Sequence, residues 1–214
     1  MVKIIAIDGP ASVGKSTLAK KISKTFKSPV LYSGKLYRAL ALKIIKRNIS
    51  FNNTEAILKC IKYIDLDNLS SAELYSSQVD NISSIISAKK QVRNKLVTLQ
   101  RSFPKKYGSG KKFAIIEGRD IGTIIFPKAD YKIFLWAAAE VRAKRRQEQL
   151  RKNAKNPSYR KIFSEINSRD RKDMTRKIAP LMPAANSVLL DTSYIDIEQA
   201  FNAIKQIILK TKTI

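Results

Sequence analysis

The feature that most constrains the fold is the segment at residues 9–16, GPASVGKS, which fits the pattern G-x4-G-K-[ST] without a mismatch. A mainly apolar run at residues 2–8 precedes it, and Leu18, Ile22 and Phe26 follow at helical spacing. The first pattern predicts a strand buried on both faces, and the second predicts a helix. A glycine-rich turn between a strand and a helix is the context that a phosphate-binding loop requires.

A loop of this type holds the phosphates of a nucleotide mainly through its backbone. Glycines let N–H groups turn inward, and the start of the following helix adds partial positive charge. We expect Lys15 to reach the β and γ phosphates and the Ser16 hydroxyl to hold Mg2+. The residues expected to bind the nucleotide are Gly9, Pro10, Ala11, Ser12, Val13, Gly14, Lys15, Ser16 and Thr17. The loop predicts binding of a nucleoside triphosphate, but GTPases, ATPases and small-molecule kinases all carry it.

Strand and helix patterns alternate along the rest of the chain. Further strands are predicted at residues 29–32, 113–117, 131–136 and 187–191, and helices at 17–26, 35–47, 54–64, 82–103, 139–151, 160–177 and 197–210. The segments 65–80, 104–112 and 153–159 are predicted to be irregular. This alternation predicts an α/β fold with a five-stranded parallel sheet and helices on both faces. Its ligands should lie beyond the carboxyl ends of the strands.

Composition excludes several classes of protein. The 214 residues include one cysteine, so there is no disulfide framework, and no histidine, so there are no histidine-based triads or metal sites. No apolar run is long enough to span a membrane, and the N-terminus lacks the pattern of a signal peptide, so we expect a cytoplasmic protein. Cys60 and Trp136 are expected to pack in the core.

The charge of the chain is strongly positive. It has 42 Lys and Arg against 17 Asp and Glu, a formal net charge of +25. A partner made of phosphates would explain this charge, but the basic residues are scattered and no RNP-like, KH-like or helix-turn-helix pattern is present. We therefore favour compositional drift together with a polyanionic small substrate over nucleic acid.

Charged residues also gather after the predicted third strand. Glu117, Arg119 and Asp120 stand at the carboxyl end of an otherwise apolar run, where three charges have no evident structural reason. Bidentate guanidinium groups neutralise several phosphate oxygens at once without donating a proton. This segment therefore favours a role in phosphoryl transfer.

A second charged group lies on one predicted helix. Arg169, Asp173 and Arg176 occur at positions i, i+4 and i+7, which share one helical face. Taken alone, this pattern fits a solvated surface with salt bridges better than a site.

Motifs at residues 7–11, 14–17, 33–38, 117–123, 126–127, 132–135, 142–146, 169–176, 179–184 and 191–193 occur in one order over almost the whole chain. Together they resemble the bacterial cytidylate kinases. The segments GRDIGT and APL, at 118–123 and 179–181, are far more specific to that family than the phosphate loop. The resemblance implies a P-loop NTPase-type kinase that uses ATP and Mg2+ to convert CMP or dCMP to CDP or dCDP.

The resemblance also implies how this single kinase domain is divided. Residues 1–33, 104–141 and 178–214 would form the core, residues 34–103 an inserted monophosphate-binding region, and residues 142–177 a helical lid. On this lid, Arg142, Arg145, Arg146 and Arg151 would lie over or beside the triphosphate.

Site residues follow from the same motifs. The catalytic residues would be Lys15, Arg119, Arg176, Arg145 and Arg146. The substrate would be bound by Ser33, Arg38, Ser84, Arg93, Arg119, Asp120, Arg169, Asp173 and Arg176. Asp120 would accept a hydrogen bond from the amine of cytosine, which penalises uracil because its C4 carbonyl has no proton to give.

Three features depart from the family pattern. Tyr32 stands where the family usually has Asp, and the segment 65–73 is too short for the small antiparallel sheet that bacterial members insert there. Ser84 and Arg93 are nine residues apart and can face one base only if the helix breaks between them.

The expected partners are the small molecules CMP and dCMP, with neither nucleic acid nor membrane, and we expect a monomer. Two other functions stay open. One is a kinase of another small acid, such as shikimate or dephospho-coenzyme A. The other is a basic ATPase whose hydrolysis nucleic acid would stimulate.

Overall fold

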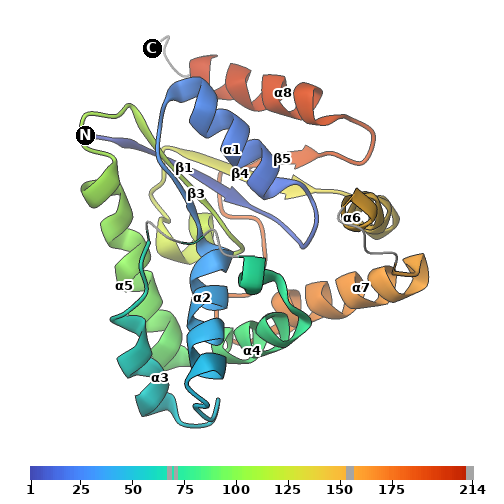
Figure 1. Cartoon of the computed structure of the whole chain (residues 1–214). Coiled ribbons are helices and arrows are strands. Elements are labelled where there is room, and N and C mark those ends of the chain that lie inside the picture. Colours follow the sequence, from blue (N-terminus) through green and yellow to red (C-terminus); the bar gives the residue numbers. More distant parts are fainter. Residues whose placement is uncertain (67–68, 70–71, 153–156, 211–214) are drawn as a thin grey trace. The chain divides into compact units, whose positions relative to one another are not determined.

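The computed structural model describes residues 1–66, 69, 72–152 and 157–210 (Figure 1). The chain forms two compact units. Residues 1–30 and 107–214 make up the first, called the core unit here, and residues 31–106 make up the second, the inserted unit.

The sheet has five strands, β1 (Lys3–Asp8), β2 (Val30–Tyr32), β3 (Phe113–Glu117), β4 (Tyr131–Trp136) and β5 (Val188–Asp191), in the order β2-β3-β1-β4-β5. β1 is central and pairs in parallel with both β3 and β4, while β4 pairs in parallel with β5. Ile5 lies opposite Ile115 on one side and Tyr131 on the other. The predicted five-stranded parallel sheet is confirmed, because apolar runs such as Ile5–Ile7 can be buried on both faces.

Among the described residues, four α-helices lie wholly in the core unit. α1 (Lys15–Phe26) and α8 (Ile197–Lys210) contact each other on one side of the sheet (Figure 1). The Tyr131 hydroxyl donates to the Ile208 carbonyl at 3.3 Å, which ties β4 to α8. α6 (Ala139–Lys152) and α7 (Tyr159–Thr175) pack together through Ala143, Ile162 and Ile166.

The inserted unit is helical. It contains α2 (Ser33–Lys46), α3 (Thr54–Ile61), a 3-10 turn at Ala72–Tyr75, α4 (Ser77–Ser87) and α5 (Lys90–Tyr107), whose last residue belongs to the core unit. Its interior is formed by apolar side chains of these helices: Leu36, Leu40, Ile57, Ile86 and Leu96. Cys60 is buried there, as predicted.

The helical stretch predicted at 82–103 is interrupted, because α4 ends at Ser87 and α5 begins at Lys90. Two predicted boundaries in the inserted unit need correction. The segment expected to be irregular contains the start of α4, whose Ser76 side chain accepts the N–H of Val79 as an N-cap. α5 also runs through buried Pro104 into the predicted loop, since packing of that turn outweighs one missing backbone donor.

Two predicted features fall partly outside the described residues. They are the loop at 153–159 and the shortened segment at 65–73.

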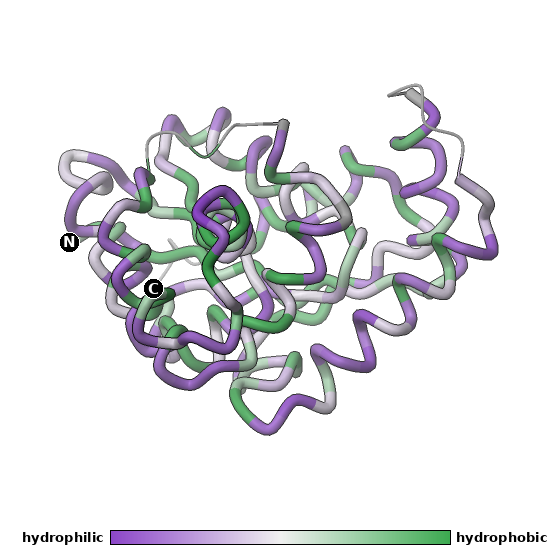
Figure 2. The backbone as a smooth tube through the Cα atoms, turned by 60° about the horizontal axis from the view of Figure 1, so that its bottom comes forward, coloured by the Kyte–Doolittle hydropathy of each residue, from purple (hydrophilic) through white to green (hydrophobic). Residues whose placement is uncertain are grey.

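Hydrophilic and hydrophobic stretches alternate along the coils in Figure 2, as expected for helices with one buried face. Trp136 is an exception to the predicted core, because 41% of its surface is exposed at the end of β4. No helix among the described residues is both long and apolar enough to cross a membrane.

Candidate functional site

The phosphate loop joins β1 to α1, and its backbone is tightly constrained. Gly9 has a φ of 149°, and a Cβ there would lie 2.3 Å from the Leu135 carbonyl oxygen, so only glycine fits. Ser12 also has a positive φ, 59°, which costs free energy for a residue with a Cβ. Gly14 at 99° ends the loop at the first turn of α1. The loop therefore includes one residue, Ser12, whose backbone conformation is unfavourable for its residue type.

Lys15 lies buried beneath this loop. Its Nζ donates to the Pro10 carbonyl at 2.7 Å. Burial lowers the pKa of Lys15 well below its usual value, and the nearby charges of Arg119 and Arg169 lower it further, while Glu117 and Asp8 act in the opposite direction. Three cationic side chains thus meet near the loop, an arrangement that favours a multiply charged anion.

Asp8, at the end of β1, has a different environment. Its carboxylate accepts the backbone N–H groups of Ile121 at 2.9 Å and Gly122 at 2.7 Å. Burial raises its pKa to about 6 against the lowering effect of these two hydrogen bonds. The acceptor carboxylate holds a π-helical turn, Ile121–Ile125, directly after Asp120. Sequence reasoning assigned Asp8 no role, although a carboxylate at the end of an apolar strand was a signal for one.

Four residues from two segments form what we call the arginine–aspartate cluster: Arg119, Asp120, Asp173 and Arg176. The Arg119 Nε donates to the Asp173 Oδ2 at 3.0 Å. Arg176 lies 3.7 Å from a carboxylate oxygen of Asp120 and 3.7 Å from one of Asp173. The segment after β3 and the end of α7 thus place two guanidinium groups and two carboxylates together.

The backbone around the cluster is also fixed. The Arg176 Nε donates to the Ala179 carbonyl, and the Leu181 N–H donates to the Asp173 carbonyl at 2.8 Å. Ala179 has a positive φ of 52°. The segment at 179–181, singled out by its sequence, therefore holds the end of α7 in place.

The predicted lid arginines have separate partners. Arg145 donates to the Thr192 carbonyl and hydroxyl and to the Ile195 carbonyl, so it joins α6 to the segment after β5. Arg146 donates to Gln149 on its own helix. Arg142 is buried and pairs with Asp170 of α7. No role was predicted for Asp170, although it continues the spacing of four from Ile162 and Ile166 and so lies on the buried face of α7.

Of the remaining predicted substrate residues, Arg169 lies on α7 in the core unit, and Ser33, Arg38, Ser84 and Arg93 lie in the inserted unit. Ser33 is buried at the start of α2, and Arg38 pairs with Asp80 and donates to the Leu74 carbonyl at 2.8 Å. Arg93 is 3% exposed and donates to the Ser87 carbonyl at 3.1 Å. The helix that carries Ser84 ends before the one that carries Arg93 begins, so the break that their joint use requires exists.

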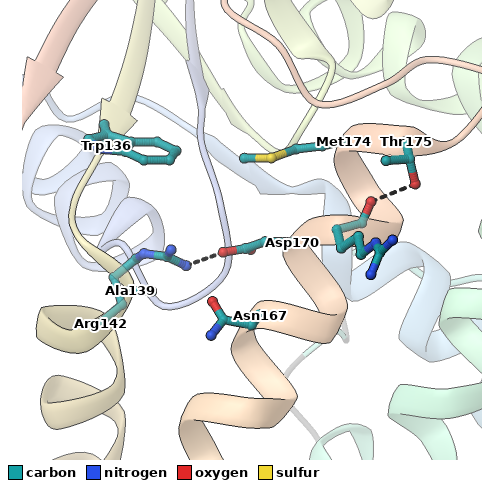
Figure 3. A pocket seen from close by; sticks show the side chains of 8 residues that line it. Trp136, Ala139, Arg142, Asn167, Asp170, Met174 and Thr175 are labelled. Atoms are coloured by element: carbon teal, nitrogen blue, oxygen red, sulfur yellow. Dashed lines mark hydrogen bonds and ion pairs between the residues drawn. The ribbon is translucent and has the colours of Figure 1, made fainter.

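A cavity of about 360 Å³ opens between the end of β4 and the helices α6 and α7 (Figure 3). Trp136 and Met174 line it, and the side chains of Arg142 and Asp170 point toward each other there. The half-exposed indole and thioether thus border a cavity instead of filling the core.

Comparison with known proteins is consistent across sequence and fold. A family described as Cytidylate kinase matches residues 5–210. A protein named Cytidylate kinase from Methylocella silvestris is 40% identical over 94% of this chain and 91% of its own length. Another of that name from Fusobacterium nucleatum is 39% identical over 98% of both chains.

One solved structure supports the fold alone. It is an uncharacterized protein from Eubacterium ventriosum, which is 13% identical and matches with a TM-score of 0.58 over 98% of this chain and 99% of its own.

Proposed function

The chain belongs to the cytidylate kinase family, and on that premise we propose that it transfers the γ-phosphoryl group of ATP to CMP or dCMP, giving ADP and CDP or dCDP. The observation that carries the proposal is the arginine–aspartate cluster in the same unit as the phosphate loop, with Arg119 close enough to Lys15 to lower its pKa.

On the donor side, the loop at residues 9–17 would bind ATP. Lys15 would exchange its bond to the Pro10 carbonyl for the β and γ phosphates, since an anionic oxygen is the stronger acceptor for an ammonium group. Of the predicted lid residues, Arg145 and Arg146 would contribute charge over the triphosphate.

Mg2+ fits the loop as a second component. The Ser16 side chain is exposed at the start of α1, and a hydroxyl oxygen suits a cation that keeps several waters and binds mainly to phosphates. When bound there, Mg2+ would neutralise charge on the triphosphate.

On the acceptor side, we assign the phosphate of CMP to Arg119 and Arg176, with Ser33 and Arg38 of the inserted unit. Arg119 and Arg176 now contact carboxylates, and a phosphate would compete for the same guanidinium donors. Arg169 and Asp173 would bind the sugar hydroxyls.

Recognition of the base would fall to Asp120, Ser84 and Arg93. The Asp120 carboxylate would accept from the exocyclic amine of cytosine, and uracil would place a carbonyl against it instead. Selection for cytosine would then come from an unpaired acceptor in the complex with UMP.

The transfer itself needs no strong base. The attacking oxygen of the CMP phosphate is already ionised, so the residues of this chain act by positioning it in line with the γ phosphorus and by stabilising charge. Closure of the proposed lid, residues 142–177, over the proposed insert, residues 34–103, and core would exclude water, the competing acceptor.

The test is ADP production with ATP and Mg2+ and a panel of CMP, dCMP, UMP, AMP, shikimate and dephospho-coenzyme A, with and without duplex DNA. Turnover with CMP and dCMP well above UMP is expected. Turnover of shikimate or dephospho-coenzyme A alone, or ADP release that only DNA stimulates, would contradict the proposal. Gel filtration of the same sample tests whether the enzyme is a monomer, as we propose.

A further inference from the structure

The Arg142–Asp170 pair, which the reaction scheme above leaves without a role, is bound directly to the phosphate loop. The Asp170 Oδ1 accepts the N–H of Ala11 at 3.1 Å, and the Arg142 Nη1 donates to the Ala11 carbonyl at 3.1 Å. The two side chains also pair with each other (Figure 3). Ala11 of the loop is therefore held by hydrogen bonds at both its N–H and its carbonyl group.

The Arg142–Asp170 ion pair is buried and does not lie at the surface. The side chains are 3% and 8% exposed, and the Arg142 Nε donates to the Ala137 carbonyl at 2.8 Å. The Arg142 Cζ lies over the indole of Trp136, 5.9 Å from the ring centroid. A charge pair so buried is costly to desolvate and is retained only where its geometry is satisfied, as it is here by several hydrogen bonds.

The geometry of the gripped peptide indicates what the pair does. The Ala11 carbonyl belongs to the peptide bond that leads into Ser12, and in a trans peptide the C=O and the following N–H point in opposite directions. Because Arg142 holds the carbonyl, the N–H of Ser12 is directed away from Arg142. The Ala11 N–H, in contrast, is occupied by Asp170.

The same peptide precedes the strained position in the loop. Ser12 has a φ of 59°, a conformation that a residue with a Cβ keeps only when its surroundings enforce it. The hydrogen bonds of Arg142 fix the peptide plane immediately before that torsion. The strain at Ser12 and the buried pair are thus two parts of one arrangement.

We propose that Arg142 and Asp170 are positioning residues for the donor: they hold the Ala11–Ser12 peptide so that the Ser12 N–H is presented to the triphosphate, and they link the loop to α6 and α7. This inference rests on the proposed function only in taking the ligand of the loop to be a nucleoside triphosphate.

The experiment measures binding of MgATP, of inorganic tripolyphosphate and of CMP, each alone, by calorimetry. Asp170→Asn keeps the size of the side chain and a carbonyl acceptor but removes the charge that holds Arg142. We expect it to weaken the binding of MgATP and of tripolyphosphate by a similar factor, about tenfold, with CMP binding unchanged. Glu165→Gln is the matched control, because it removes an exposed carboxylate from the same helix and should leave all three affinities unchanged.

Two further variants separate positioning from a merely structural role. Arg142→Lys keeps the charge, but its one nitrogen cannot take the places of both the Nε that bonds Ala137 and the Nη1 that bonds Ala11 and Asp170. It should therefore weaken the binding of MgATP and of tripolyphosphate. Adding Ser12→Gly to Asp170→Asn should recover part of the lost tripolyphosphate affinity, because glycine adopts a positive φ without the cost that serine bears.

Loss of thermal stability in Asp170→Asn with unchanged binding of both phosphate ligands would overturn the proposal, as would equal losses for CMP and tripolyphosphate. A wild-type protein that binds tripolyphosphate but does not phosphorylate CMP would refute the proposed function alone. The tripolyphosphate comparison would still decide the role of the pair.

Discussion

Two aspartates on α7, Asp170 and Asp173, lie about one helical turn apart but differ in burial and in the partners of their carboxylates. Asp170 faces a single arginine and a backbone N–H, and its side chain is almost fully buried. Asp173 belongs to the arginine–aspartate cluster, where one contact is a 3.0 Å hydrogen bond and the other is a looser pair at 3.7 Å. The first arrangement is fully satisfied, and the second keeps partners that a ligand can replace.

One helix thus carries both a structural ion pair and charges that are placed to bind a ligand. A charge pair that must hold a backbone in place is enclosed and given several hydrogen bonds. In the arginine–aspartate cluster the side chains of Arg119 and Asp173 are 19% and 17% exposed, against 3% and 8% for Arg142 and Asp170. Four substitutions test this difference between enclosed and accessible charges, and they follow from the largest expected effect to the smallest.

The largest effect is expected for Asp170→Ala, which leaves the buried guanidinium of Arg142 without its carboxylate partner. Breaking a buried ion pair from one side costs about 3–5 kcal/mol, so the free energy of unfolding should fall by that amount in denaturant titrations. Glu165→Ala on the exposed face of α7 should change it by less than about 0.5 kcal/mol. Equal effects of the two substitutions would remove the distinction drawn for Asp170.

Arg176→Ala should have the reverse profile. Removing one donor to a developing phosphate charge typically costs about 10²–10³ in rate, so kcat/KM with CMP should fall by that factor. The free energy of unfolding should fall less than in Asp170→Ala, because Asp173 keeps its hydrogen bond from Arg119. Lys172→Ala, which removes an exposed cation from the same helix, serves as the control. A variant that loses stability but retains its kcat/KM would place Arg176 among the architectural charges.

Asp8 extends the comparison to a buried carboxylate that is held by two backbone N–H groups. Because its folded pKa is raised from 3.8 to about 6, the folded state binds its proton more tightly than the unfolded state. Its contribution to stability is therefore favourable at low pH and is lost as pH rises from about 4 to 6, by about 3 kcal/mol in total. Unfolding titrations across that range should show a weaker pH dependence for Asp8→Asn, and an unchanged dependence would contradict the assignment.

The smallest effect is expected for Asp120→Ala. It should raise the KM for CMP and narrow the preference for CMP over UMP by about 1–3 kcal/mol, because the acceptor for the cytosine amine is gone. The ratio of CMP to dCMP should stay constant, since the sugar contacts are assigned elsewhere. An unchanged ratio of CMP to UMP would remove Asp120 from base recognition.

The candidate site could be foreseen only in part. The phosphate loop was predictable because a short, contiguous pattern encodes it between two periodic elements. The grouping of Arg119 with Asp173 followed from motif resemblance, since the two lie 54 positions apart in sequence. The placement of Arg145 against Thr192 and Ile195 could not be foreseen, because the segment after β5 reaches α6 only through the order of the strands.

Local errors had tertiary causes as well. Trp136 was expected in the core because it ends an apolar strand, but the strand extends past the packed interior and leaves the indole at the rim of a cavity. The break between α4 and α5 has no proline or glycine to announce it. Helical periodicity alone does not reveal a boundary when apolar residues continue on both sides of it.

The parallel sheet, the strand–loop–helix at residues 3–26 and most of the helices follow from local sequence patterns, because hydrophobic periodicity and glycine placement act within a few neighbouring residues. Which charges hold the backbone and which are open to a ligand depends on the packing of distant segments. The spacing of Ile162, Ile166 and Asp170 places this aspartate on the buried face of α7, but its partner Ala11 is 159 positions away and is not indicated by any local pattern. Burial and partner choice belong to the folded chain, because they depend on what other elements bring to the same place.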